Sequence, residues 1–135
     1  MNYRIVDGMD TIRTEDVVRL LRMTYWADKR PEETIVRSLR NSACYGVYVE
    51  GTETLAGFAR VITDYATSYY LCDVIIDPAF RHNGLGKALV SHIVSSPELK
   101  GLRGFLVTQD AHGLYRQFGF ETVEGRVMIK APDRS

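Results

Sequence analysis

Apolar residues recur every three to four positions in the first third of the chain, which is typical of amphipathic helices. Thr14 stands at the N-terminal cap of the first helix, with Glu15 and Asp16 in its first turn. Pro31 stands in the first turn of the second helix, where proline is favoured. The apolar positions are Val17, Leu20, Leu21, Thr24 and Tyr25 in the first helix and Ile35, Val36 and Leu39 in the second. The pattern therefore predicts two helices joined by the exposed polar connection ADKR.

The period changes to two in the middle of the chain, which indicates strands. Residues 44–50 and 54–63 flank a connection of hairpin length. Residues 69–77 are almost continuously apolar, as in a central strand that is covered on both faces. A shorter strand is predicted near the N-terminus, at residues 4–7. These segments predict an antiparallel sheet.

A strand, helix and strand unit follows. Its helix covers residues 85–94, and a short buried strand follows at residues 104–108. Because this unit is a crossover, strands 69–77 and 104–108 should run parallel, with the helix packed across them in the right-handed sense. A ligand would lie at the carboxyl ends of these two strands.

The end of the chain predicts one more helix and a hairpin. Asp110 is a candidate cap for this helix, and Gly119 would end it. Residues 120–123 and 126–130 would form a hairpin around Glu124 and Gly125, exposing an edge that can pair with a second subunit. The apolar stripe of the helix is Ala111, Leu114, Tyr115 and Phe118. A monomer or a homodimer is expected.

These elements predict one α+β domain over residues 1–135, a mostly antiparallel sheet with one parallel strand pair and four flanking helices. The 45% hydrophobic content is enough for one buried core in a chain of 135 residues. Lys and Arg number 17, as do Asp and Glu, so no net field favours nucleic acid or an anionic membrane as a partner.

Cysteine usage and hydropathy point to the cytoplasm. Cys44 and Cys72 lie inside apolar strands, and neither has a Cys or His at metal-ligand spacing, so reduced thiols and no metal site are expected. No apolar run reaches membrane-spanning length, and residues 1–9 lack the apolar core of a leader peptide.

The stretch FRHNGLGKAL, residues 80–89, joins the central strand to the crossover helix. The first N–H groups of a helix have no partners within it, and the helix dipole puts roughly half a positive charge there. Gly84 and Gly86 remove β-carbons that would hold a diphosphate away, and they permit a left-handed backbone. Arg81 and Lys87 add positive charge. The pattern R-x-x-G-x-G therefore predicts a pyrophosphate site.

Two other nucleotide-binding motifs also contain paired glycines. A Rossmann fingerprint requires a small residue where Leu89 stands, and a Walker loop requires a hydroxyl residue where Ala88 stands, so both are disfavoured. For Gly84 and Gly86 taken alone, an ordinary turn is the simpler interpretation.

The segments DVIIDPAFRHNGLGKAL and AHGLYRQFGF favour the anion site over the turn. In this order they resemble two motifs of the GNAT superfamily of acyl-coenzyme A-dependent N-acyltransferases, and the predicted elements fit that family over nearly the whole chain. The segments YWADKRP and FARVITDYAT are similar to small stand-alone bacterial members. The resemblance implies the GNAT fold, acetyl-CoA as acyl donor, and transfer of the acetyl group to an amine.

The resemblance also implies roles for the matching residues. Backbone groups of Val74 and Ile76 would pair with pantetheine as if it were an added strand, and Tyr115 would lie near the sulfur. Many members have Asn where Thr108 stands, so no side-chain amide contact to the cofactor arm is expected from that position. The residues expected to bind the cofactor are Val74, Ile75, Ile76, Arg81, His82, Asn83, Gly84, Leu85, Gly86, Lys87, Ala111 and Tyr115.

Acyl transfer to an amine requires an unprotonated amine, a stabilised oxyanion and a proton for the departing thiolate. A free backbone N–H near Val74 or Ile75 would hold the oxyanion of a tetrahedral intermediate formed by direct attack. Tyr115, with a reference pKa of about 10, would donate the proton; packing on its apolar stripe is the alternative role. The base is expected among Asp64, Asp73, Tyr69 and Tyr70, beside the acceptor, with Asp73 as the catalytic candidate. A cap or an ion-pair partner is the alternative role for Asp73.

Acceptor recognition is expected from the connection YWADKRP and from the strands beside it. The candidates are Trp26, Asp28, Arg30, Asp64, Tyr69 and Tyr70. Helix packing is the alternative for Trp26, and a turn is the alternative for Asp64. The acceptor is expected to be a small-molecule amine or a protein amine. The rival function is a non-catalytic module that binds CoA or acyl-CoA as a sensor.

Overall fold

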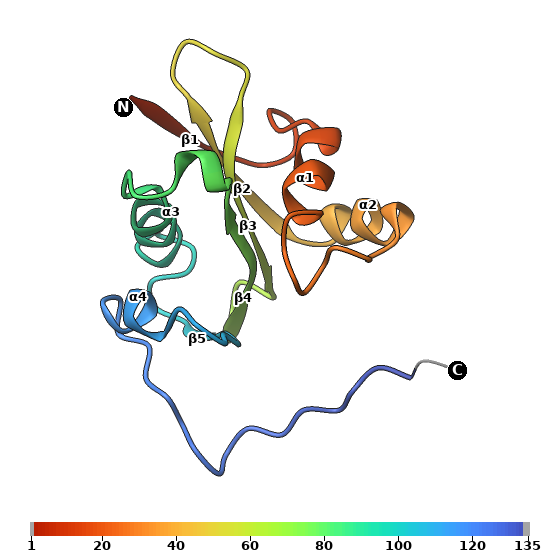
Figure 1. Ribbon diagram of the computed structural model, residues 1–135. Helices are drawn as coiled ribbons and strands as arrows, with labels where there is room; N and C mark the ends of the chain where they lie inside the picture. The colour runs from red at the N-terminus through yellow and green to blue at the C-terminus, as the bar shows by residue number, and fades with distance from the viewer. Residues whose placement is uncertain (1, 134–135) are drawn as a thin grey trace.

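The computed structural model describes residues 2–133 and contains a five-stranded sheet with its strands in chain order (Figure 1). Neighbouring strands pair antiparallel from the first to the fourth, and the fourth and fifth pair parallel. The strands are β1 (Tyr3–Asp7), β2 (Ala43–Val49), β3 (Leu55–Thr63), β4 (Ser68–Ile76) and β5 (Arg103–Phe105). The predicted α+β class with a parallel pair at one edge is therefore confirmed.

Helices cover both faces of the sheet. On one face lie α1 (Thr14–Leu21) and α2 (Glu32–Arg40), and on the other lie α3 (Leu85–Val94) and α4 (His112–Arg116) (Figure 1). A short 3-10 helix, η1 (Pro78–Phe80), joins β4 to α3. The crossover helix α3 has the bounds that the sequence predicted.

Alternation along the strands divides the apolar side chains into two layers, because successive residues of a strand point to opposite faces. The layer under α3 and α4 contains Val47, Ala59, Val61 and Leu71 together with Leu89 and Ile93 of α3. The layer under α1 and α2 contains Cys44, Tyr48 and Phe58 together with Leu20, Leu21 and Ile35. The sheet is therefore buried on both sides over its central strands.

Glycine at position 104 allows β5 to join the sheet. Gly104 pairs with Tyr69, and a β-carbon at Gly104 would lie 2.5 Å from Cζ of the Tyr69 ring. Tyr69 is buried, so its ring has no room to move aside. The Tyr69 ring thus packs directly against the β5 backbone.

The predicted helix caps were wrong in detail. Thr14 is the first residue of α1, and no side chain caps that helix. Pro31 precedes α2, which begins one residue later, at Glu32. In α4, which follows the N-cap residue Ala111, no side chain makes a cap hydrogen bond, so Asp110 does not cap it; the Ala111 N–H donates to Oγ1 of Thr108 at 3.0 Å. A threonine or aspartate caps a helix only when its own backbone is extended, and the spacing of apolar residues does not specify that backbone conformation; Thr14 is already helical.

The predicted final hairpin is also wrong. Residues 120–123 and 126–130 form no strands, although a turn forms at residues 124–126 with Gly125 at φ +75°. Beyond that turn the chain runs away from the sheet instead of returning (Figure 1). A two-stranded ribbon alone is marginally stable in water, so the turn by itself does not hold its two halves together. We call residues 121–133 the C-terminal arm.

Candidate active site

β4 ends in a turn that is fixed at several points. The Asp77 carboxylate accepts a hydrogen bond from the Ala79 N–H at 2.9 Å, and the Asp77 N–H donates to the Ala56 carbonyl at 2.8 Å. The other carboxylate oxygen pairs with Arg19 of α1 at 2.9 Å. Burial alone would raise the pKa of Asp77, but these donors outweigh it and hold the pKa below its usual value. The start of the glycine loop is therefore anchored to β3 and to α1.

The loop then opens into the N-terminus of α3. Gly84 precedes the helix in the left-handed conformation, φ +74°, and no side chain among residues 2–133 caps it. The amide of Asn83 donates to the carbonyls of Phe80 and Arg81 at 3.1 and 3.2 Å, which closes the loop below the helix. Arg81 and Lys87 are exposed on either side. The helix thus presents free N–H groups and its positive dipole end to an open surface.

Packing within the chain does not require glycine at position 86. A β-carbon there would meet only Cγ1 of Ile76, at 3.6 Å, an ordinary van der Waals contact. Gly84 is different, because its left-handed backbone favours glycine although a β-carbon would meet nothing within 4 Å. His82 is left-handed as well, at φ +69°. A backbone that alternates in this way forms concavities suited to anions, and the bare Gly86 lets a ligand approach it.

β4 carries a bulge at Asp73 and Val74, just before this loop. The register against β3 shifts between Phe58 and Arg60, so that two β4 residues stand opposite one β3 residue. Asp73 has a left-handed backbone at φ +53°. A bulge of this kind changes the face to which later side chains point. Ile75 accordingly packs toward α1 and α2, whereas Val74 and Ile76 lie toward α3.

β4 and β5 separate just before the bulge. Their pairing covers Ser68–Tyr70 and Arg103–Phe105, and β4 then continues to Ile76 with β3 beside it on one side and, in the described part of the chain, no strand on the side of β5. This unpaired edge leads directly to the glycine loop. The predicted residues Val74 to Ile76 therefore lie on the unpaired edge of β4, and this edge leads into the loop that contains Arg81 to Lys87.

The Asp73 carboxylate is the centre of a buried ion-pair cluster. It accepts hydrogen bonds from Arg30 Nη1 at 2.8 Å, Arg60 Nε at 2.9 Å and Trp26 Nε1 at 3.0 Å, and its side chain is 3% exposed. Burial would raise the pKa of Asp73, but hydrogen bonds and charge from Arg30 and Arg60 outweigh it and hold the pKa below its usual value. A carboxylate held in this way is a weak proton acceptor. The geometry supports the ion-pair role for Asp73 over the role of base.

The same cluster folds the connection between α1 and α2 over the bulge. Arg22 Nη1 donates to the carbonyls of Arg30 at 2.5 Å and Ala27 at 3.4 Å, and the Trp26 ring meets Tyr25 edge-on at 5.0 Å. Trp26 and Arg30 are therefore occupied by contacts within the chain, although the Trp26 side chain remains 41% exposed. Asp28 is exposed, and its carboxylate has no hydrogen bond among residues 2–133. Of the three, Asp28 has the free charged group.

Tyr115 of α4 is buried on the α3 side of the sheet. Its ring packs edge-on against Phe120 at 6.0 Å, and no group within residues 2–133 hydrogen-bonds to its hydroxyl. Burial, with a smaller effect of Asp110, raises the pKa of Tyr115 to about 12. The phenol thus keeps its proton at neutral pH and has a donor without a partner. Ala111, the other predicted cofactor residue of this region, starts the same helix.

The remaining acceptor candidates lie apart from one another. Asp64 closes the turn between β3 and β4, where its carboxylate accepts from the N–H groups of Ala66 and Thr67 at 2.9 and 2.8 Å. These hydrogen bonds lower the pKa of Asp64. The turn lies at the opposite end of β4 from the glycine loop, in keeping with the structural alternative. Tyr69 packs under β5, whereas Tyr70 is 39% exposed and points to the opposite face.

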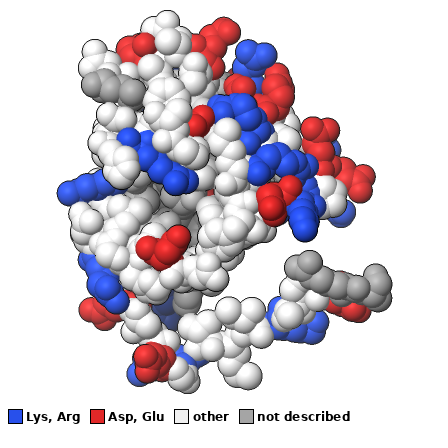
Figure 2. Space-filling view, in the orientation of Figure 1, with Lys and Arg blue, Asp and Glu red and all other residues white. Residues whose placement is uncertain are grey.

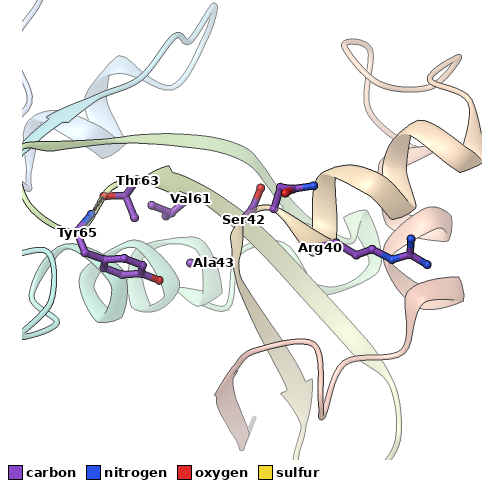
Figure 3. Close-up of a pocket in the computed structure, with 7 residues that line it drawn as sticks. Arg40, Ser42, Ala43, Val61, Thr63 and Tyr65 are labelled. Carbon is purple, nitrogen blue, oxygen red and sulfur yellow. Dashed lines mark hydrogen bonds between the residues drawn. The ribbon is translucent and has the colours of Figure 1, made fainter.

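An open hollow of about 300 Å³ also lies far from the glycine loop (Figure 3). It is bounded by the start of β2 and the end of β3, with Arg40, Asn41, Ser42, Ala43, Val61, Thr63 and Tyr65 along it. The Tyr65 N–H donates to Oγ1 of Thr63 at 2.9 Å on its rim. None of the predicted site residues lines this hollow, and it contains no charged group except Arg40.

Sequence reasoning missed Arg19 and Arg60. Both carry an ion pair that shapes the site, Arg19 with Asp77 and Arg60 with Asp73. The sequence does indicate an ion pair for Arg60. It is the lone charged residue inside the apolar strand LAGFARVIT, and a buried charge needs a partner. The sequence does not indicate an ion pair for Arg19, since a basic residue near the end of a helix is common on solvent-exposed faces.

Within residues 2–133 no three His, Cys, Asp or Glu side chains come close enough to bind a metal ion. Over that range no helix has both the length and the apolar character needed to cross a bilayer. Burial raises the pKa of both free thiols, Cys44 and Cys72, to about 11.

The sequence matches those of known acetyltransferases. The sequence model of the Acetyltransferase (GNAT) family matches residues 14–120. An uncharacterized N-acetyltransferase, ycf52-like, of Prochlorococcus marinus is 31% identical over 105 residues, which cover 73% of this chain and 58% of that protein. The chain spans about half the length of the curated relatives it matches.

Solved structures show the same fold. A member of the GNAT family from Xanthomonas campestris pv. campestris is 34% identical, with a TM-score of 0.89, and the match covers 98% of this chain and 94% of that one. Coverage of this extent takes in the C-terminal arm. A predicted acetyltransferase from Clostridium acetobutylicum, solved with acetyl-CoA, has a TM-score of 0.70 at 14% identity over 96% of this chain and 95% of its own. The latter likeness shows the fold alone.

Proposed function

Because the chain belongs to the Acetyltransferase (GNAT) family, we propose that it transfers an acetyl group from acetyl-CoA to a primary amine, with residues 1–135 as one catalytic domain. The observation that carries this proposal is the uncapped N-terminus of α3, which continues the unpaired edge of β4. The diphosphate of a coenzyme matches the helix N-terminus, and an amide-containing arm matches the unpaired strand edge.

The loop and the β4 edge would hold the two ends of acetyl-CoA. Backbone N–H groups between Arg81 and Lys87 would bind the pyrophosphate, with the charges of those two side chains beside it. The bare Gly86 supports this role, because nothing in the chain needs the space that a side chain would fill there. Backbone groups of Val74 and Ile76 would pair with the pantetheine arm. The bound coenzyme supplies the activated thioester.

Three groups of this chain would serve the chemistry. A backbone N–H near Val74 or Ile75, on the edge of β4 that β5 leaves unpaired, would hold the oxyanion. Tyr115 would donate its proton toward the departing thiolate, since burial keeps the phenol neutral and its hydroxyl has no partner within residues 2–133. The amine would attack directly, because the thiol of Cys72 has a pKa of about 11 and is not a thiolate at neutral pH.

The acceptor would approach from the α1–α2 side of the bulge. The connection that includes Trp26 and Asp28 borders this approach, and Tyr70 is exposed on the same face. Asp73 is held ionised by two guanidinium groups, so we propose that the acceptor enters as the free amine. Small-molecule and protein amines both satisfy this description, and the cytoplasmic location stays a prediction.

Two measurements on the folded chain test the proposal. Calorimetry with CoA should give saturable heat, and acetyl-CoA with a panel of primary amines should release free thiol while one amine gains the mass of an acetyl group. Tight binding without thiol release from any amine would instead identify a CoA sensor. Absence of heat from a protein with an intact melting transition would contradict the assignment of the glycine loop.

A further inference from the structure

The C-terminal arm, residues 121–133, stands apart from the rest of the molecule. Every one of its residues is exposed, and no hydrogen bond joins residues 121–132 to the body of the chain. Figure 2 shows the arm projecting below the body, with uncharged atoms over much of its length. Its apolar side chains have exposed fractions of 48% for Val123, 61% for Val127, 97% for Met128 and 75% for Ile129. An apolar strand-forming segment in this state lacks a surface to cover.

β5 has an open edge, whereas the arm is a strand-forming segment without a partner. It is the last strand of the sheet and pairs only with β4 among the described residues, so its outer row of N–H and C=O groups is open. Phe105 is 47% exposed, and Val107, just beyond β5, is 67% exposed. An open edge with apolar side chains along it is a template for a further strand. An open hollow of about 320 Å³, lined by Thr67, Ser68, Arg103 and Phe105, lies along the same edge.

The sheet face beside β5 is also uncovered. Ile62 pairs with Tyr70, and Tyr70 pairs with Phe105, so these three side chains form a row across β3, β4 and β5. Their exposed fractions are 44%, 39% and 47%, although the rest of that face is buried under α1 and α2. The apolar surface therefore continues from the strand edge onto the face of the sheet.

The turn at residues 124–126 explains why the arm does not cover this surface in its own chain. Gly125 adopts φ +75°, as in a hairpin turn, but the segments on its two sides diverge (Figure 1). An opened hairpin presents the pairing groups of both halves to solvent. When a chain carries both an open edge and a free strand, two identical copies satisfy both by exchanging the strand.

We infer that two copies of this chain form a dimer by exchanging their C-terminal arms, with residues 126–130 of each copy pairing as a strand along the β5 edge of the other. Val127 and Ile129 would point to one face of the extended sheet and Met128 to the other, so apolar side chains would be covered on both faces. Each copy gives one arm and receives one, which closes the assembly at two copies. This inference does not depend on the proposed function.

The mass of the chain in solution tests the inference. Light scattering after gel filtration should give twice the chain mass of 15.3 kDa for the full chain and a single mass for a chain that stops after Phe120, which keeps the contact of Phe120 with Tyr115. The double variant Val127→Asp with Ile129→Asp should also give a single mass. A matched control, Thr122→Asp with Ala131→Asp, adds the same charges outside residues 126–130 and should remain dimeric.

Cross-linking separates exchange from an arm that folds back on its own copy. Val107→Cys and Met128→Cys are placed in separate copies with different tags, in a background with Cys72→Ala, and the two copies are produced together. Cys44 stays, because it is 3% exposed. A short bismaleimide should link the two tags only when both new thiols are present. A full chain of single mass, or a link within one copy that carries both thiols, would overturn the inference.

Discussion

The carboxylate of Asp73 connects parts of the molecule that are far apart in the sequence. Trp26 and Arg30 come from the connection between α1 and α2, Arg60 comes from β3, and Asp73 itself sits at the bulge of β4. An ionised group buried in this way is stable only while its partners are present. The cluster therefore fixes the position of the connection relative to the edge of β4.

The variant Asp73→Asn should separate this positioning role from catalysis. Removing one partner of a buried pair leaves two guanidinium groups without their anion, so we expect a loss of about 3 kcal/mol in the free energy of unfolding at neutral pH. We also expect a higher KM for the acceptor with little change in CoA affinity. Asp28→Asn is the control, since Asp28 is exposed and should alter stability by less than about 0.5 kcal/mol.

The stability difference between wild type and Asp73→Asn should depend on pH. The folded-state pKa of Asp73 lies below that of the unfolded chain, about 3.9. The carboxylate thus stabilises the fold above the unfolded value, and this contribution is lost as the pH falls through the folded value. Urea unfolding should show the largest difference near pH 7 and a smaller one below pH 4. A constant difference would assign the effect to packing.

Tyr115→Phe tests the proton donor. The change removes only the hydroxyl, which has no hydrogen bond within residues 2–133, so the melting temperature and the CoA affinity should stay close to those of wild type. We expect kcat to fall roughly 10²-fold, the low end of the range for general acids. Steady-state kinetics with calorimetry as a control would measure this. Turnover near wild type would leave Tyr115 with a packing role.

At the residue scale, the sequence predicts the glycine loop and Tyr115 as site residues because both lie in short-range motifs, and these roles stay predictions. It left the role of Asp73 open, because an ion-pair partner and a base look alike in one dimension. The choice depends on Arg60 and Arg30, which approach Asp73 only after β3 pairs with β4 and the connection folds over the sheet. Local periodicity contains no information on contacts between residues that are distant in the sequence.

The elements around the site show which local patterns decide structure. The crossover helix α3 was predicted with its observed bounds because Gly84 and the apolar stripe mark its start and course. Thr14 and Asp110 were wrong as caps, since capping depends on backbone angles just outside each helix. The prediction of the final hairpin was wrong for a different reason. A strand requires a paired strand, and the turn at Gly125 does not hold the segments on its two sides together.

The N-terminus of α3 allows stability and binding to be changed in opposite directions. Gly86→Ala should raise the free energy of unfolding by about 0.5–1 kcal/mol, because alanine favours a helix and its methyl would meet only Ile76 at ordinary contact distance. The same methyl should weaken CoA affinity at least several-fold, since it would occupy the approach to the backbone. Thermal melts and calorimetry measure the two effects.

Ser91→Ala is the matched control for this variant. It raises the helix propensity of α3 as well, but one and a half turns away from the loop. We expect it to stabilise the fold without changing CoA affinity. Equal affinities for the wild type and Gly86→Ala would show that no ligand approaches the backbone at position 86.

The whole molecule combines a well-covered sheet centre with an open, partly apolar edge at β5. If two copies exchange arms, unfolding also separates them, so stability depends on protein concentration. The melting temperature of the full chain should then rise by roughly 2–3 °C for each tenfold increase in concentration. The chain that stops after Phe120 should melt at a constant temperature. Differential scanning calorimetry over a concentration series compares the two, and a constant value for the full chain would argue against exchange.

The ion pair between Arg19 and Asp77 has a consequence for how the binding of one substrate affects the binding of the other. Arg19 also donates to the Leu55 carbonyl at 2.8 Å. Three residues later, Arg22 donates to the carbonyl of Arg30 in the connection between α1 and α2. Helix α1 and its C-cap residue Arg22 thus contact both the start of the glycine loop and the connection between α1 and α2. Docking of the donor should slow deuterium uptake over residues 22–31, and Arg19→Gln should abolish that protection. By reciprocity, a bound amine should raise the affinity for the donor by the same factor as the donor raises the affinity for the amine.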